Sequence, residues 1–184
     1  MSKQVCKPQN VNMSQVTFSE PKILPNGGKN SYLNYNGGML VLQTPKMSLP
    51  WNMSCWRGPN GDQPPKYSID LSFKGEDVNP KLTGLLNFTK DLDKKMLEAG
   101  VENSLPWFTK KNMSPDVVEA LYSPMLKLSV DKNTGEPNGK YPPSVKVRVP
   151  NYDGNFTLDV YDSKREKVDA ANLENILERG CEVR

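Results

Sequence analysis

The sequence contains no histidine, and its three cysteines, Cys6, Cys55 and Cys181, are scattered without CxxC spacing. Without histidine, Ser-His-Asp and Cys-His mechanisms lose their general base, and most transition-metal sites lose a common ligand. An odd number of isolated cysteines predicts neither a disulfide framework nor a zinc site. Glycine-rich phosphate loops and calcium-binding loops are also missing from the sequence. We therefore expect no enzyme, no metal and no cofactor.

Long apolar runs are missing as well. No stretch approaches the roughly 20 apolar residues of a membrane-spanning helix, and the N-terminus has no signal-peptide core. Together with the sparse cysteines, these features predict a protein of a reducing, intracellular compartment that does not associate with membranes.

Proline and glycine, by contrast, are plentiful, with 16 and 13 residues among 184. This composition favours short strands and many turns over a helical bundle. Basic charge gathers in two regions, because residues 1–66 carry 7 basic and 2 acidic side chains and residues 104–150 carry 7 and 4. Residues 1–15 are polar and patternless, which predicts a flexible arm before a single domain over 16–184.

A β-hairpin is the most clearly specified element. Asp153-Gly154 suits a type I′ turn, because both central positions of that turn need positive φ. A two-residue turn would set the cross-strand pairs Val149–Leu158, Val147–Val160, Arg148–Asp159 and Lys146–Tyr161. One face of the hairpin would then be apolar and the other polar, and a slip by one residue would mix them.

The polar face of this hairpin has two interpretations. It is either a solvated sheet surface with a cross-strand ion pair, or a ligand-facing surface on which Lys146 and Arg148 meet phosphates and tyrosines stack on bases. Asp159 weakens the second interpretation, because it would neutralise part of the charge of Arg148.

The remaining pattern predicts strands interrupted by helices. Alternation over 66–74 indicates a half-buried strand. Asn79 and Pro80 begin a helix that Gly100 can end, with an apolar stripe formed by Leu82, Leu85, Leu86, Leu92 and Met96. Further elements are expected as an edge strand over 16–24, a hairpin over 31–43, and helices over 114–121 and 169–178. The proline-rich segment 44–65 holds Trp51 and Trp56, which serve either to stack on bases or to fill the core.

Several short motifs follow one another from Val118 onward. They are Leu121-Tyr122-Ser123-Pro124, the Asp131 to Gly135 turn, Lys140-Tyr141-Pro142-Pro143 and Pro150-Asn151-Tyr152-Asp153-Gly154, preceded by an upstream segment from Leu42 to Trp51. In these motifs and their order the chain resembles the phage T7-type single-stranded DNA-binding proteins of large DNA viruses of algae and amoebae.

The resemblance implies a mainly β, OB-like barrel with a helical insertion over about 79–121, which coats single-stranded DNA during viral replication or recombination in the infected cell. Family members continue past the position of Arg184 with further strands and an acidic tail that recruits replication proteins. We therefore expect an incompletely closed barrel, and we leave replication-protein partners and self-association open.

Residue type and position near these motifs nominate the contacts to DNA. The phosphate-binding candidates are Lys127, Lys140, Lys146 and Arg148, and the stacking candidates are Tyr141, Tyr152 and Trp51. The alternative from another class is a structural or protein-interaction component of a virion, for which a broad apolar patch would be the sign. An enzyme ranks below both, because no pair of catalytic carboxylates is recognisable.

Overall fold

The computed structural model describes residues 3–152 and 154–184, which divide into two compact units. We call residues 3–45 and 76–125 the helical unit, and Lys46–Gly75 with Leu126–Arg184 the sheet unit. Each unit is built from two separate stretches of the chain. The expectation of a single domain over 16–184 stays a prediction. No helix among the described residues is both long enough and apolar enough to cross a membrane.

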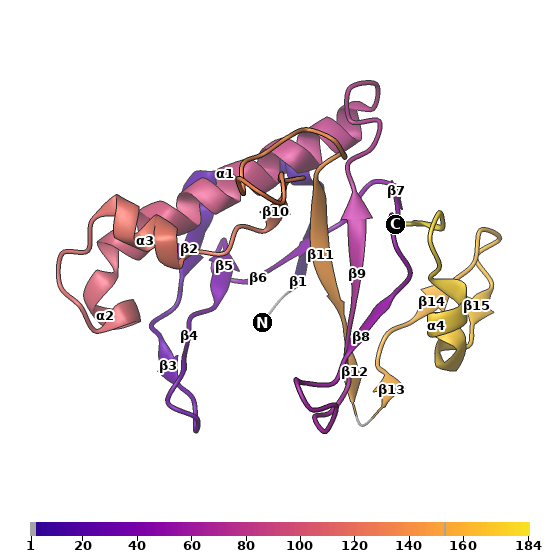
Figure 1. Ribbon diagram of the computed structural model, residues 1–184, viewed down its shortest axis with the longest axis horizontal. Helices are drawn as coiled ribbons and strands as arrows, with labels where there is room; N and C mark the ends of the chain where they lie inside the picture. Colours follow the sequence, from indigo (N-terminus) through magenta and orange to yellow (C-terminus); the bar gives the residue numbers. More distant parts are fainter. Residues whose placement is uncertain (1–2, 153) are drawn as a thin grey trace. The chain divides into compact units, whose positions relative to one another are not determined.

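The helical unit combines short strands with all three of the longer helices (Figure 1). Its elements are β1 (Lys3–Cys6), η1 (Pro8–Asn10), η2 (Met13–Gln15), β2 (Val16–Phe18), β3 (Lys22–Ile23), β4 (Lys29–Asn30), β5 (Leu33–Tyr35), β6 (Met39–Leu42), α1 (Pro80–Glu102), α2 (Ser104–Phe108) and α3 (Pro115–Leu121).

The sheet unit holds the long strands β9 and β11, which lie side by side in Figure 1. Its elements are β7 (Met47–Ser48), β8 (Ser54–Trp56), β9 (Lys66–Ser72), β10 (Leu126–Lys127), β11 (Ser144–Val149), β12 (Asn151–Tyr152), β13 (Asn155–Phe156), β14 (Val160–Tyr161), β15 (Lys167–Val168), η3 (Ala170–Asn172), α4 (Leu173–Ile176) and β16 (Glu182–Val183).

The main sheet is antiparallel throughout, with strand order β10-β11-β9-β7-β16 and with β8 also paired to β9. The predicted strand over 66–74 is confirmed as β9, which is the central strand. Strands β7 and β8 both pair with one edge of β9. The other edge of β9 is therefore free to pair with all six residues of β11.

Alternation gives this sheet one apolar face. Tyr67, Leu71 and Val149 point to the same side and are each at most 5% exposed. The Phe156 ring lies 4.8 Å from the Tyr67 ring, and Leu173 is 1% exposed. The segment that follows β11 therefore covers the apolar face and leaves the polar side chains on the opposite one.

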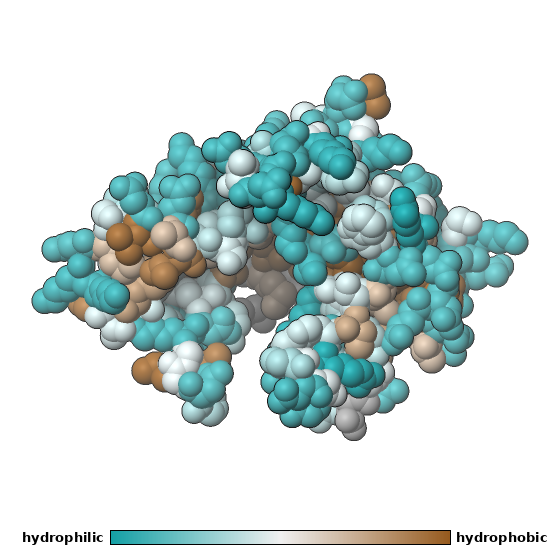
Figure 2. Space-filling model, in the orientation of Figure 1, coloured by the Kyte–Doolittle hydropathy of each residue, from teal (hydrophilic) through white to brown (hydrophobic). Residues whose placement is uncertain are grey.

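In the helical unit, the predicted start of α1 is confirmed. The Asn79 side chain accepts a hydrogen bond from Lys81 N at 3.1 Å, and Pro80 occupies the first helical position. The apolar stripe is buried at Leu82, Leu85, Leu86 and Leu92. The helix over 114–121 also forms as predicted, with Pro115 at its first position. Hydrophobic side chains gather at the molecular surface over this helix, α3 (Figure 2).

The prediction that Gly100 ends α1 is wrong, because the helix continues to Glu102. Gly100 is buried, and a Cβ atom at this position would lie 2.7 Å from Cγ1 of Val118. Val118 belongs to α3 and is itself 3% exposed. The glycine is therefore required by close helix packing and not by a turn.

The predicted hairpin forms only at its tip. Asn151 pairs with Phe156 and Tyr152 with Asn155, which is the predicted register; the turn residue Asp153 lies outside the described residues. Thr157 N still donates to Pro150 O at 3.0 Å, but there the pairing ends.

Beyond this tip the predicted hairpin pairing is wrong. Strand β11 pairs with β9 and at one end with β10, whereas β14 pairs with β15. Strand β9 has the same alternation and offers six partners, so an alternating pattern cannot tell which of two similar strands pairs with β11.

Two further expectations differ from the structure. Residues 3–15, predicted as part of a flexible arm, form β1, η1 and η2, and β1 pairs in parallel with β6. The helix predicted over 169–178 is split into η3 and the short α4, in which Ile176 is 37% exposed.

The expected combination of strands and an inserted helical segment is present, although helix and strand each make up about 27% of the chain. The strands belong to one six-stranded and several two-stranded sheets, and within residues 3–152 and 154–184 they do not close into a barrel.

Replacing Gly100 with alanine should destabilise the protein. Overpacking against Val118 costs about 1–3 kcal/mol, which exceeds the gain of about 1 kcal/mol in helix propensity. Gly84→Ala in the same helix is the matched control, because its Cβ would meet only the side chain of Gln9, at 3.3 Å. Urea unfolding of both variants measures the difference, and equal stability of the two would contradict the packing role of Gly100.

Candidate nucleic-acid interface

The polar face of the main sheet gathers cations from three strands. The ladder register places on one side the alternate residues of β8, β9 and β11, with one residue of β10 at the edge. This polar face consists of Ser54, Trp56, Lys66, Ser68, Asp70, Ser72, Ser144, Lys146, Arg148 and Lys127. Three of the four phosphate-binding candidates from the sequence therefore share one surface, although their partners differ from those predicted.

Arg148 lies opposite Ser68 and is exposed. The predicted pairing with Asp159 is wrong, because Asp159 forms an ion pair with Lys167 at 2.7 Å. Among the residues that the structure describes, no carboxylate oxygen lies within 4.0 Å of the guanidinium of Arg148 or the ammonium of Lys127. Both cations are therefore available to an anionic ligand.

Lys146 is in a different electrostatic position. Its ammonium lies 3.8 Å from a carboxylate oxygen of Asp70, which faces it across the β9–β11 ladder. The Asp70 side chain is 17% exposed and that of Lys146 is 43% exposed. Because this pair is partly shielded from water, Asp70 neutralises much of the field that Lys146 would present to a phosphate.

The polar face also contains one aromatic ring, that of Trp56 in β8. Trp56 is 48% exposed and lies opposite Lys66 in the β8–β9 ladder. The Lys66 ammonium lies 4.8 Å from the centroid of the Trp56 ring, a cation–π distance. The pair therefore presents a positive charge and a stacking surface side by side.

Two exposed tyrosines flank β11 along the chain. Tyr141, 59% exposed, precedes the strand by three residues, and the ammonium of Lys140 lies 5.5 Å from its ring centroid. Tyr152, 79% exposed, follows the strand in β12. These three predicted residues are near the ends of the strand, and the ladder does not assign them to the polar face.

Trp51 lies apart from these residues, in the connection between β7 and β8. It is 59% exposed, and the guanidinium of Arg179 lies 5.7 Å from its ring centroid. The side chain of the next residue contacts the C-terminal segment, because Asn52 Oδ1 accepts a hydrogen bond from Arg179 N at 2.8 Å. The structure does not bring Trp51 to the polar face.

Sequence reasoning missed Lys66 as a contact and chose Trp51 over Trp56. The signal was present in the alternation of β9, whose polar residues Lys66, Ser68 and Asp70 share one parity. It could be used only together with the β8–β9 and β9–β11 registers, which join residues far apart in the chain.

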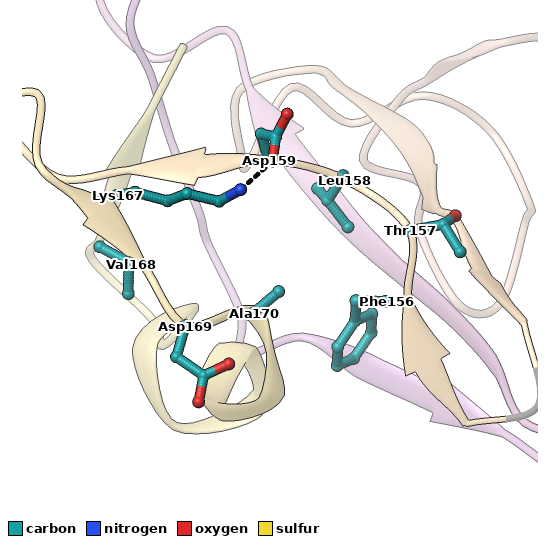
Figure 3. A pocket seen from close by; sticks show the side chains of 8 residues that line it. All are labelled: Phe156, Thr157, Leu158, Asp159, Lys167, Val168, Asp169 and Ala170. Atoms are coloured by element: carbon teal, nitrogen blue, oxygen red, sulfur yellow. Dashed lines mark ion pairs between the residues drawn. The ribbon is translucent and has the colours of Figure 1, made fainter.

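A pocket of about 560 Å³ lies elsewhere in the sheet unit, between the segment 156–159 and the segment 167–170. Figure 3 shows Lys167 directed toward Asp159, with which it forms the ion pair described above. Asp169 accepts a hydrogen bond from Ala171 N at 3.0 Å and so caps η3. The charged groups of this pocket are engaged within the chain, which makes it a weaker candidate than the polar face.

The opposite, apolar face contains one buried phenol, that of Tyr67. Hydrogen bonding with Glu174, together with burial and the nearby Cys55, raises the pKa of Tyr67 to about 12. Because Glu174 belongs to α4, the raised pKa reflects the covering of this face by the C-terminal segment.

No family model, curated protein or solved structure matches this chain.

The raised pKa of Tyr67 predicts a loss of stability in alkali. An unfolded tyrosine ionises near its ordinary pKa of 10.0, whereas the folded one keeps its proton to about 12. The stabilisation is complete below pH 10 and is lost as the pH rises toward 12, by about 1.4 kcal/mol for each pH unit.

The measurement is the free energy of unfolding in urea as a function of alkaline pH. Tyr67→Phe should flatten the alkaline decline, because phenylalanine cannot ionise, whereas Tyr152→Phe at an exposed position should keep the wild-type slope. An unchanged slope in Tyr67→Phe would contradict the burial of a protonated phenol at this site.

Proposed function

We propose that this protein binds single-stranded DNA across the polar face of its main sheet and has no catalytic activity. The observation that carries the proposal is the combination of Arg148 and Lys127, which have no carboxylate partner among the described residues, with the exposed Trp56–Lys66 pair on one surface. Cations that track a backbone and aromatic rings that stack on bases are the two elements of sequence-tolerant single-strand binding.

The spacing on β11 supports a strand that runs along the sheet. Alternate residues of a β-strand lie about 7 Å apart on one face, so a phosphate backbone parallel to β11 would pass Lys146 and then Arg148. Trp56 lies two strands away from β11, on the same side of the sheet. Bases that point away from the phosphates, toward β8, would reach the indole ring.

The resemblance found in the sequence adds a second line of support. Two of its similar pieces, Lys140 to Pro143 and Pro150 to Gly154, border β11 at its two ends. We propose on this basis that the sheet unit is an incompletely closed OB-like barrel, a fold that presents a sheet face to oligonucleotides. On the same resemblance we propose that the activity serves viral DNA replication or recombination inside the infected cell, and we leave replication proteins open as partners.

The alternative function, a structural or interaction component, is favoured by one observation in the helical unit. Val117 and Leu121 of α3 are 46% and 61% exposed, and Figure 2 shows hydrophobic side chains at the surface over this helix. An exposed apolar surface of this kind is typical of a protein contact. It does not compete with the polar face for residues, so a binding experiment can separate the two functions.

The first test is fluorescence anisotropy of a labelled oligonucleotide, single-stranded or duplex, titrated with the protein at several salt concentrations. We expect tighter binding to the single strand and a linear fall of the logarithm of affinity with the logarithm of salt, because phosphate contacts release counterions. A folded protein that binds neither form would favour the structural alternative, and equal affinity for the duplex would contradict base stacking.

Arg148→Ala should reduce the salt slope more than Lys146→Ala does. Each neutralised phosphate of a single strand contributes about 0.7 to the slope, and Arg148 has no carboxylate partner among the described residues, whereas Lys146 is paired with Asp70. Lys164→Ala, in the exposed turn between β14 and β15, is the control and should leave the slope unchanged. Equal effects of Arg148→Ala and Lys164→Ala would remove β11 from the interface.

Trp56→Ala should weaken single-strand binding by about 1–3 kcal/mol, the usual contribution of one stacked base. Trp51→Ala is the matched control, because it removes an exposed indole, 59% against 48% for Trp56, that the ladder does not place on the polar face. We expect little change for this control. A loss of affinity confined to Trp51→Ala would move the stacking site to the β7–β8 connection.

A further inference from the structure

The helical unit contains a second pocket, which is unrelated to the polar face. Its volume is about 520 Å³, within the range of small-molecule sites. Strands β2, β4 and β5, helices α1 and α2, and the segment after α3 all contribute side chains to it. Several parts of the chain therefore converge on one cavity within a single compact unit.

One wall of the pocket is aromatic. The Trp107 ring makes an edge contact with Phe18 at a centroid distance of 5.4 Å and another with Phe108 at 6.5 Å. Leu92 and Met96 of α1 line the pocket as well. Edge-to-face packing fixes the positions of these rings and leaves an apolar surface toward the cavity, which suits an aliphatic or aromatic ligand body.

Two ionisable side chains near this pocket, Asp93 and Tyr122, are hydrogen-bonded to each other. The Asp93 carboxylate accepts hydrogen bonds from the Tyr122 hydroxyl at 2.5 Å and from Met125 N at 3.0 Å, so it is already engaged. Burial and this hydrogen bond with Asp93 raise the pKa of Tyr122, which keeps the phenol neutral. The tyrosine therefore adds no charge to the pocket.

Lys29 supplies the cation. Its ammonium donates to Pro106 O at 2.6 Å, which holds it beside Trp107, the next residue along α2. An ammonium has three donors, so two remain for a ligand. No carboxylate lies within 4.0 Å of the Lys29 ammonium in the part of the chain that the structure describes.

We propose that this pocket binds a small amphipathic carboxylate, with its apolar body against Trp107 and Leu92 and its carboxylate on the Lys29 ammonium. The cation selects an anion over a neutral compound, because a charge-assisted hydrogen bond in a partly apolar site is stronger than a neutral one. The lining selects an apolar body over a polar metabolite, whose hydroxyl groups would lose their water without gaining partners.

Decanoate is a suitable probe, and decanol is its neutral counterpart. The variant Trp51→Phe/Trp56→Phe leaves Trp107 as the one tryptophan of the chain, so its fluorescence reports on the pocket alone. We expect saturable quenching or enhancement by decanoate, with an affinity about 10- to 100-fold above that of decanol. Calorimetry on the unaltered protein checks that the substitutions do not create the site.

Three substitutions locate the ligand. Lys29→Met should lower the affinity for decanoate to that for decanol and leave the affinity for decanol unchanged, whereas Lys110→Met, an exposed lysine just after α2, should change neither. Ser123→Phe fills the pocket from an exposed position and should weaken both ligands. Thermal melting confirms that each variant is folded.

Equal binding of decanoate and decanol, or an unaltered decanoate affinity in a folded Lys29→Met variant, would overturn the assignment of the carboxylate to Lys29. No response of Trp107 to either compound would overturn the pocket as a ligand site. Neither result depends on DNA binding, because the oligonucleotide titrations probe residues of the sheet unit.

Discussion

The antiparallel ladder between β9 and β11 is the constraint on which the sheet unit depends. Six consecutive residue pairs fix the register, and each pair matches apolar with apolar or polar with polar side chains. Sliding the ladder by one residue would bring Val147 opposite a polar residue and move Lys146 toward the core. The need to bury Tyr67, Leu71 and Val149 therefore determines which cations appear together on the other side.

The covering of the apolar face has a consequence for charge. Residues 156–177 supply Phe156 and the buried side chains of Leu173 and Leu177, and Glu174 of this segment contributes to the raised pKa of Tyr67. Asp159 belongs to the same segment and forms an ion pair with Lys167 there. The acid expected to neutralise Arg148 is thus engaged elsewhere, and Asp70 of the central strand neutralises Lys146 instead.

Local signals in the sequence predicted what depends on nearby residues. The Asn79-Pro80 cap, the apolar stripe of α1, the strand over 66–74 and the register at the hairpin tip all depend on contacts a few residues apart. The partner of β11 could not be predicted in this way, because β9 lies more than seventy residues away in the chain and has the same alternation as the expected partner.

Gly100 shows the same limit for helices. A glycine near the end of an apolar stripe is typical of a helix stop, and only the presence of Val118 on a packed neighbour distinguishes a stop from a close contact. The residues of the candidate site also fall into two groups, those that local sequence signals predict and those that depend on long-range pairing. Lys127, Lys146 and Arg148 could be nominated from type and motif, whereas Lys66 and Trp56 join them only through ladders that link distant segments.

The two candidate sites differ in the kind of ligand that their physics favours. The polar face is exposed, so its charges act through water and are screened by salt, which suits many weak, repeated contacts with a polymer of phosphates. The pocket in the helical unit places apolar side chains beside one exposed cation, Lys29, so it combines a single charged hydrogen bond with apolar contacts to one small ligand. One such cavity adds little to the binding affinity of a polymer, and an open sheet adds little to the binding affinity of a small carboxylate. The separation of the two surfaces into different units therefore allows each to be altered by substitution without disturbing the other.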